Sequence, residues 1–340
     1  MKIVISGYNT CCMNPSGGVQ VRIKKIYELL SMKNDIEVEY FRPMETDFNN
    51  VDILHLFKLD PEYYNLVQKA KIKGVKIVLS SIVPLEGGLK IDLYRKYINR
   101  LPVLNVYKMA FVILSYVDVL IVETPKEADF ISKHYGFDKR KIVVIPNGVD
   151  INSYKGHDIY DKINGQKDYV LHVGRFDENK NQINVIKALK GTGIDVVFIG
   201  GGDNENSAYY DECKRLAADD SHFHFLGWIN NDSNLLKSAY SNAKVFILPS
   251  FKETFGLVLL EAAICGCNLA ISKSLPILDF GIFDKAYLFD PKDVDDIKEK
   301  VGNAFVTVRN DNIKDKVLAL FSWNAIIDKH IKVYKTLLHQ

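Results

Sequence analysis

Short apolar runs alternate with longer amphipathic stretches along most of the chain. In its first part, apolar runs predict buried strands at 2–6, 37–41, 53–57, 76–80, 119–122 and 143–145. Helical spacing of the apolar positions predicts helices between them, at 19–30, 61–73, 88–100 and 126–135. This alternation is typical of a parallel, doubly wound α/β sheet, whose ligands bind beyond the carboxyl ends of the strands.

The same alternation begins again after a polar, glycine-containing segment that ends near residue 167. Further strands are predicted at 169–173, 195–199, 224–226, 243–248 and 268–272. A last amphipathic helix follows Ser322, which is a plausible cap for it. The chain therefore predicts two doubly wound sheets in tandem, with a cleft between their facing strand ends.

The most informative segment is PSFKETFGLVLLEAAICGCNLAIS, residues 249–272. It predicts the end of a strand, a polar turn, a helix over 257–264 and a new strand after Gly266. Glu253 lies in the turn, and Glu261 lies two helical turns on, roughly 8–12 Å away at about 1.5 Å per residue. Two carboxylates at this separation can hold the two ends of one extended polar ligand.

The backbone between the two glutamates offers a seat for an anion. The amides of Thr254, Phe255 and Gly256 are predicted at a helix N-terminus, which favours a phosphate group. The segment therefore predicts a sugar nucleotide as ligand. The alternative is that Glu261 is a buried structural carboxylate and Glu253 an ordinary loop acid.

Other chemistry-bearing residues are expected at the ends of predicted strands. Gly17 and Gly18 open the first helix and permit close approach of an anionic ligand, although a glycine pair is also a common turn. Arg175 and Lys180 follow a strand of the second series and would supply cations. The basic residues of the first helix, Arg22, Lys24 and Lys25, are expected on its solvated face.

Composition limits the class of protein. The 340 residues are 47% hydrophobic and 25% charged with a net charge of +2, as in ordinary soluble proteins and unlike the strongly basic domains that bind nucleic acid. The five cysteines have no metal-ligand spacing and suit small core positions. Polar residues interrupt the apolar stretch 103–122, and the first strand is too short for a secretory signal. A cytoplasmic protein is expected.

One helix has a face that suits a lipid surface. The stretch 89–104 places an apolar row beside basic residues, an arrangement that could rest on an anionic membrane at its inner face. A solvated helix over a core is the alternative interpretation.

A set of motifs in a fixed order resembles a known family. The double glycine, PNGVD at 146–150, VGRF at 173–176, the glycine turn IGGGD, FLGW and the two glutamates separated by seven residues resemble a retaining glycosyltransferase of family 4. The resemblance is close in the second half of the chain. It implies the α/β GT-B fold, with two Rossmann-like doubly wound domains facing a cleft. It also implies an acceptor domain at 1–150, a donor domain at 151–320 and a final helix, 321–340, that crosses back.

The resemblance also implies roles for individual residues. Arg175 and Lys180 would bind the donor diphosphate, Glu253 would orient the donor sugar, and Glu261 would hold the ribose. Other donor contacts would come from Gly17, Gly18, Trp228, Ile229, Thr254, Phe255 and Gly256. Such enzymes need no metal ion or other cofactor, because cations and amides neutralise the diphosphate of a UDP-, GDP- or dTDP-linked sugar.

The first half departs from the family at the strand that ends in Ser80 and Ser81, where many members have a histidine or an aspartate. His55, Ser81 and Glu86 are the remaining acceptor-side candidates, although His55 lies inside an apolar pattern that also suits a core position. The expected activity is transfer of a hexose or deoxyhexose to a saccharide or lipid-linked saccharide in synthesis of a cell-surface polysaccharide such as O-antigen or capsule. A non-catalytic sugar-nucleotide-binding subunit and a GT-B epimerase are the alternatives.

Overall fold

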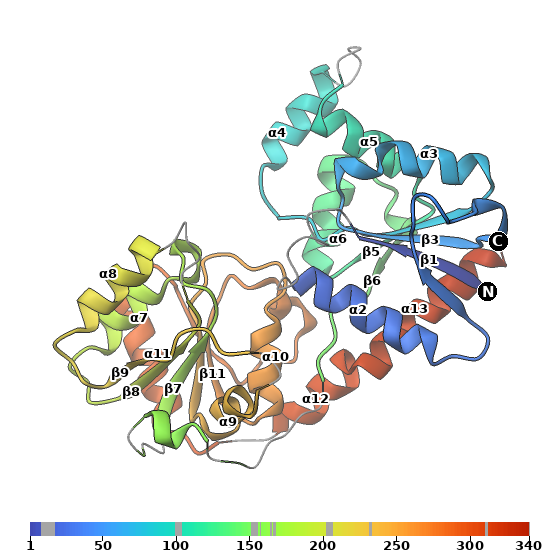
Figure 1. The fold of residues 1–340 in the computed structure, drawn as a ribbon. Helices are drawn as coiled ribbons and strands as arrows, with labels where there is room; N and C mark the ends of the chain where they lie inside the picture. The colour runs from blue at the N-terminus through green and yellow to red at the C-terminus, as the bar shows by residue number, and fades with distance from the viewer. Residues whose placement is uncertain are drawn as a thin grey trace. The chain divides into compact units, whose positions relative to one another are not determined.

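The computed structural model describes residues 1–7, 18–98, 104–150, 156, 158–163, 165, 168–201, 207–230, 233–309 and 312–339. The chain divides into two compact units. Unit 1 consists of Met1–Gly148 together with Trp323–Gln340, and unit 2 consists of Val149–Ser322. Each unit is built around one parallel sheet (Figure 1).

The sheet of unit 1 has six strands in the order β2-β1-β3-β4-β5-β6. Their bounds are β1 (Lys2–Ser6), β2 (Glu37–Tyr40), β3 (Ile53–Phe57), β4 (Lys76–Ser80), β5 (Val119–Val122) and β6 (Ile142–Val144). Every pairing is parallel, so all carboxyl ends meet at one edge of the sheet. Strands β3 and β4 are almost wholly buried, as expected for strands covered on both faces.

Helices cover both faces of this sheet. Helices α2 (Gly18–Ser31) and α13 (Trp323–Leu338) pack on one face, where Ile26 and Tyr334 join the core. Helices α3 (Tyr64–Ile72), α5 (Val106–Tyr116) and α6 (Pro125–Phe130) pack on the other. Helix α4 (Gly88–Leu93) continues into a π-helical turn, Tyr94–Ile98, and α6 into another, Ile131–Tyr135.

The sheet of unit 2 has six parallel strands in the order β12-β11-β10-β7-β8-β9. Their bounds are β7 (Tyr169–Val173), β8 (Asp195–Ile199), β9 (Phe223–Phe225), β10 (Val245–Leu248), β11 (Asn268–Ser272) and β12 (Tyr287–Phe289). Helices α9 (Asn234–Asn242), α10 (Leu257–Ile264) and α12 (Asn312–Phe321) cover one face, and helices α7 (Gln182–Leu189), α8 (Ser207–Ala217) and α11 (Val294–Val306) cover the other.

Short 3-10 turns connect several of these elements. They are Phe48–Asn50, Pro61–Tyr63, Lys139–Lys141, Tyr160–Lys162, Glu178–Lys180 and Pro276–Phe280. Cys213 and Cys267 are buried free thiols, and burial raises the pKa of each to about 12. They are therefore small core residues, as their setting in the sequence indicates.

The predicted doubly wound α/β architecture is confirmed in both units. The elements that were not predicted include β12, which has only three residues, and α12. Throughout the described ranges, no helix reaches the length and apolar character needed to span a bilayer.

Candidate functional site

A polar site of unit 2 lies where two neighbouring strands end. Strands β7 and β10 pair in parallel, with Val170 beside Val245, so the loops that follow them emerge side by side. From these loops Lys180 and Glu253 meet, with Nζ 2.5 Å from Oε1. Ser250 donates a second hydrogen bond to the same oxygen at 2.7 Å. Within the described residues Oε2 of Glu253 has no partner, so it can accept a bond from a ligand hydroxyl.

Asn179 holds the two loops together. Its side-chain amide donates to the carbonyl of Lys252 at 2.8 Å, and its side-chain oxygen accepts from the Lys252 amide at 3.0 Å. Its own carbonyl accepts from the amide of Phe251 at 2.9 Å. Three bonds between these loops fix the place of Lys180 relative to Glu253.

The side chain of the next residue, Asn181, stabilises the same turn. It is buried with a left-handed backbone at φ 61°, and its side chain donates to the carbonyls of Pro249 and Pro291 at 3.2 and 2.7 Å. Asparagine tolerates this conformation better than most side chains do. Its amide therefore stabilises a turn that also carries the cation of the site.

A buried histidine supports the loop after β7. Nδ1 of His172 lies 3.2 Å from the carbonyl of Ile247, which requires a proton on that nitrogen. Nε2 then accepts from Gln182 at 3.0 Å, and the same amide nitrogen of Gln182 donates to the carbonyl of Arg175 at 2.7 Å. Burial lowers the pKa of His172 to about 4, so the ring is neutral at physiological pH and acts as a structural support.

Arg175 lies on the same loop but nearer to the surface. Its guanidinium is 3.6 Å from Asp177, and its side chain is 58% exposed. Asp177 also caps the turn by accepting from the amide of Lys180 at 2.9 Å. Arg175 thus lies five residues before Lys180 in the sequence, and the ion pair that the structure shows for its guanidinium is with Asp177.

The glycine turn after β8 packs directly against the loop that carries Arg175. Gly200 has a φ of 137°, and a Cβ atom there would lie 1.9 Å from the carbonyl oxygen of Gly174. The amide of Gly200 donates to the carbonyl of Gly227, which brings the next loop alongside. Trp228 in that loop is 63% exposed, whereas Ile229 packs on the core.

The N-terminus of α10 offers backbone donors next to Glu253. Gly256 caps the helix with φ 96°, and no side chain caps it. The Phe255 side chain is buried against Phe280 and Phe321, so only its backbone faces a ligand. Among the residues that the structure describes, the amides of Thr254, Phe255 and Gly256 have no acceptor. These open donors can receive an anion.

Glu261 lies further along α10 in a poorly solvated place. Burial raises the pKa of Glu261, the neighbouring Tyr240 phenol offsets part of this rise, and Asp150 adds to it. Burial, with the nearby Glu261 carboxyl group, raises the pKa of the Tyr240 phenol well above its usual value. Glu261 is thus a buried carboxyl group with no ion pair among the described residues, and its role as a ligand for the ribose stays a prediction.

In unit 1 the acceptor-side candidate residues lie in different environments. Gly18 begins α2, and Gly17 lies outside the described residues. His55 is fully buried, with Nε2 2.9 Å from Ser80 and Nδ1 2.8 Å from the Tyr334 hydroxyl. Burial lowers its pKa well below the usual value, so the geometry favours the core interpretation of His55. Glu86 is exposed after β4.

Ser81 belongs to a buried polar cluster that sequence reasoning missed. Its hydroxyl donates to Glu127 at 2.7 Å, and Glu127 also accepts from the amides of Val83 and Glu123. Arg22 forms an ion pair with Glu123 at 2.6 Å and is 1% exposed. The prediction that Arg22 lies on a solvated face is therefore wrong.

A sequence signal for this cluster does exist. Arg22 precedes Ile26 and Leu30 at intervals of four, so it lies on the buried face of α2. Burial raises the pKa of both Glu123 and Glu127, although the Arg22 charge opposes this shift. The cluster surrounds the carboxyl ends of β4 and β5, which is where unit 1 would meet a ligand.

The described ranges hold no group of three or more His, Cys, Asp or Glu side chains arranged to bind a metal ion. The polar chemistry of the candidate site in unit 2 thus consists of one ion pair, backbone donors and a second, poorly solvated carboxyl group.

Comparison with known families gives two matches that follow one another along the chain. Residues 160–305 match the family described as "Glycosyl transferases group 1", and residues 20–153 match "Glycosyltransferase Family 4". A phosphatidyl-myo-inositol mannosyltransferase of Mycobacterium tuberculosis is 27% identical over 57% of this chain and 54% of its own length. The chain thus spans about half the length of that relative.

Solved structures resemble the whole chain in fold. A sucrose-phosphate synthase from Thermosynechococcus elongatus superposes with a TM-score of 0.77 at 18% identity, covering 100% of both chains. The Anabaena protein Alr3699/HepE, solved in complex with UDP, superposes with a TM-score of 0.76 at 15% identity, covering 99% of this chain and 100% of its own. At these identities the likeness establishes the fold.

Proposed function

We infer, for a chain that belongs to the family 4 type of glycosyltransferases with the GT-B fold, that unit 2 binds a nucleotide-diphosphate sugar and that the protein transfers its glycosyl group to an acceptor hydroxyl. The observation that carries this proposal is the Lys180–Glu253 pair beside the open N-terminus of α10. It combines a cation, a carboxylate oxygen that can accept a further hydrogen bond, and backbone amides that can donate to an anion.

The donor fits these groups in one order. The diphosphate would lie on the amides of Thr254, Phe255 and Gly256, with Lys180 and Arg175 as its cations. Glu253 would accept a sugar hydroxyl through Oε2 while Lys180 and Ser250 hold Oε1. Glu261 would hold the ribose hydroxyls, and Trp228, with Ile229 behind it, would lie near the base.

The proposed reaction breaks the bond between the anomeric carbon and the leaving phosphate oxygen, and forms a bond to the acceptor oxygen. Negative charge grows on the diphosphate, where preorganised donors can lower the barrier. The acceptor would attack from the face that the nucleotide leaves, so configuration would be retained. A phosphate oxygen of the donor would take the acceptor proton, which needs no protein base in unit 1.

The donor and acceptor classes rest on the relatives. One structural neighbour was solved with UDP, and one relative is named for mannosyl transfer to a phosphatidylinositol. We therefore propose a hexose or deoxyhexose donor and a saccharide acceptor that can be lipid-linked, in synthesis of a cell-surface polysaccharide. We also propose that no metal ion takes part, because Lys180 and Arg175 supply the positive charge; transfer should persist in EDTA.

A surface of unit 1 supports contact with anionic lipid. The side chains of Leu89, Leu93 and Tyr97 are 80%, 57% and 61% exposed along α4 and the turn that follows it. Lys90 and Lys96 lie among them, and Lys96 also contacts the Tyr97 ring. Exposed apolar side chains among cations are typical of helices that rest on a membrane surface.

Sedimentation with phosphatidylglycerol vesicles tests this contact. Leu89→Ser with Leu93→Ser should reduce the bound fraction, whereas Ile72→Ser, which changes an equally exposed residue of α3, should not. Equal binding of all three proteins at low salt would reject the contact while leaving the transfer reaction untouched.

A panel of UDP-, GDP- and dTDP-linked sugars tests the transfer reaction. Binding and turnover of one donor should depend on Lys180 and Glu253, so Lys180→Ala and Glu253→Gln should each lower kcat/KM by about 10²–10³. Lys187→Ala, at an exposed position of α7, is the matched control. If both site variants keep parental turnover, this assignment of the site is wrong. If the parent binds a donor but transfers its glycosyl group to no acceptor, that result favours the alternative of a non-catalytic sugar-nucleotide-binding subunit.

A further inference from the structure

One face of the unit 1 sheet is only partly covered. Neighbouring strands lie about 4.8 Å apart, so six strands span roughly 24 Å, whereas two packed helices cover about 16–20 Å. Helices α2 and α13 are the elements that cover this face, and β6 is the outermost strand on one side. The uncovered width remains as a hollow of about 400 Å³ between β5, β6 and α13.

The hollow has an apolar floor. Val119, Val143 and Ile145 contribute from the strands, and Val333 and Leu337 contribute from α13. Val119, Val143 and Val333 are partly exposed at the margin of the core that lies under α2 and α13. A strip of hydrocarbon thus remains open to solvent, where an alkyl chain could displace water.

The rim of the hollow is cationic. Arg140, Lys141, Lys329 and Lys332 line it from two elements, with Asp118 as the acidic residue of the lining. Asp118 is held by Lys71 at 2.6 Å, and Arg140 is paired with Asp138. Lys141, Lys329 and Lys332 have no ion-pair partner within the described part of the chain. The rim therefore has an excess of positive charge.

Among these cations, Lys329 is partly removed from water by the fold. Its side chain is half-buried, and burial alone lowers the pKa of its ammonium group. No described carboxylate offsets this cost. An anion bound at the rim would stabilise the Lys329 ammonium group electrostatically and so compensate for the hydration that burial removes.

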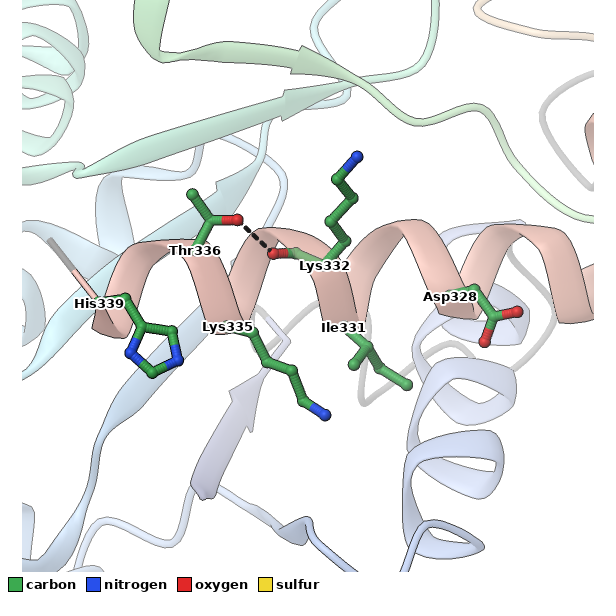
Figure 2. A pocket seen from close by; sticks show the side chains of 6 residues that line it. All are labelled: Asp328, Ile331, Lys332, Lys335, Thr336 and His339. Atoms are coloured by element: carbon green, nitrogen blue, oxygen red, sulfur yellow. Dashed lines mark hydrogen bonds between the residues drawn. The ribbon is translucent and has the colours of Figure 1, made fainter.

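The lysines on the two sides of α13 differ in their contacts. Figure 2 shows Lys332 and Thr336 projecting on one side of the helix and Lys335 with Ile331 on the other. Lys335 pairs with Asp35 at 2.8 Å. Lys332 and Thr336 also line the hollow described above, whereas Lys335 does not. Lys335 therefore offers a matched control on the same helix.

The hollow is separate from the candidate donor site. It lies wholly in unit 1, and its rim residues Asp118, Arg140 and Lys141 precede β5 and β6. They therefore lie toward the amino ends of these strands, while the donor site belongs to unit 2 and to the carboxyl ends of β7 and β10. A ligand bound here would not occupy the donor site.

We propose that this hollow binds an amphipathic phosphate, with a monophosphate headgroup at the Lys141–Lys329–Lys332 rim and a single alkyl or isoprenoid chain along the apolar floor. A volume of about 400 Å³ lies within the range of small-molecule sites. The lining has no aromatic ring to stack on a base, and its acidic residue is already paired, so nucleotides and free sugars fit less well.

Dodecyl phosphate, kept below its micelle threshold, tests the proposal by calorimetric titration of the full chain without any nucleotide sugar. Inorganic phosphate supplies the headgroup alone, and dodecyl maltoside supplies the same chain with a neutral head. We expect dodecyl phosphate to bind at least about tenfold more tightly than either, since both parts of the hollow must be used. Equal affinity for dodecyl phosphate and either of the other two probes overturns the proposal.

Three variants locate the binding. Lys329→Gln with Lys332→Gln should weaken dodecyl phosphate binding by about tenfold or more, because each lost charge-assisted bond costs about that factor. Lys335→Gln should leave binding unchanged. Val333→Phe fills the floor and should weaken dodecyl phosphate but not inorganic phosphate. Parental affinity in the double variant, or equal loss in Lys335→Gln, overturns the assignment.

Discussion

The backbone of Gly174 and that of Gly200 approach so closely that a Cβ atom on Gly200 would lie 1.9 Å from the carbonyl oxygen of Gly174. The contact joins the loop after β7, which carries Arg175 and leads to Lys180, to the turn after β8. Gly200 also has a φ of 137°, which side chains rarely adopt. Any side chain at this position must separate the two loops.

Gly200→Ala should lower the free energy of unfolding by about 3 kcal/mol, from backbone strain together with the clash. The neighbouring variant Gly201→Ala meets no atom within 4 Å and should change stability by less than about 0.5 kcal/mol. Urea unfolding measures both. Equal stability of the two variants would mean that the close approach does not constrain the loops.

The loop tie at Asn179 gives a prediction about donor affinity. Asn179→Ala removes two side-chain bonds to the backbone of Lys252, so Lys180 and Glu253 should lose their fixed geometry. We expect KM for the donor to rise about tenfold and stability to fall by about 1–3 kcal/mol. Lys252→Ala keeps the backbone groups that Asn179 binds, so steady-state kinetics of that variant should match the parent. A rise in KM of the same size there would contradict the role of Asn179.

The buried pair Arg22–Glu123 predicts strong coupling in unit 1. Removing one partner leaves the other charge buried, so Arg22→Met or Glu123→Gln should each cost about 3–5 kcal/mol. The double variant should cost less than the sum, because neither charge is then left alone. Lys24→Met, on the exposed side of α2, is the control. Additive effects in the cycle would show that the two residues act independently.

Buried histidines predict a loss of stability in mild acid. Burial, with the nearby Arg22 and Lys329 charges, lowers the pKa of His330 to about 3, and the unfolded chain restores an ordinary value near 6.5. Below pH 6.5 the unfolded state therefore binds more protons, so stability falls as the pH falls toward 3. At pH 5 the cost for this residue is about 2 kcal/mol relative to pH 7 or above.

His330→Leu should remove that part of the pH dependence. Nε2 of His330 has no partner in the described residues, so the replacement sacrifices the bond from Nδ1 to Ile326 and leaves no new polar atom buried. Urea unfolding at pH 7 and pH 5 should show a smaller difference for the variant than for the parent. Glu123 and Glu127, whose pKa values are raised, act in the opposite direction in both proteins. An unchanged difference would contradict a neutral, buried His330.

The sequence contains much of the donor-side information in local form. Glu253, Gly256 and Glu261 follow one strand and precede one helix, so their order along the chain already places them near a strand end. Lys180 could be predicted only to the extent that β7 and β10 are neighbours, and sequence order does not reveal that pairing. Local patterns thus find the segment, while the sheet order determines which segments meet.

Contacts that depend on packing could not be predicted in this way. Asn179 is one polar residue in a loop, and its importance comes from three bonds to a segment more than seventy residues away. Arg22 reads as a surface residue from its charge, although its spacing with Ile26 puts it on the buried face. Strand β12 has three residues, too few for a clear period. For Asn179 the decisive information therefore lies in a distant part of the chain, whereas for Arg22 it lies in the spacing along α2.

The division of the chain also sets the order in which its parts can be completed. Unit 1 is assembled from Met1–Gly148 and Trp323–Gln340, so the whole of unit 2 is inserted within its sequence. During synthesis unit 2 is therefore fully translated before the helix that supplies Trp323, Ile326 and Tyr334 to the core of unit 1. Until that helix arrives, only α2 covers this face of the first sheet, and His55 lacks its hydrogen-bond partner Tyr334. The first part of the chain to be made is the last to be finished.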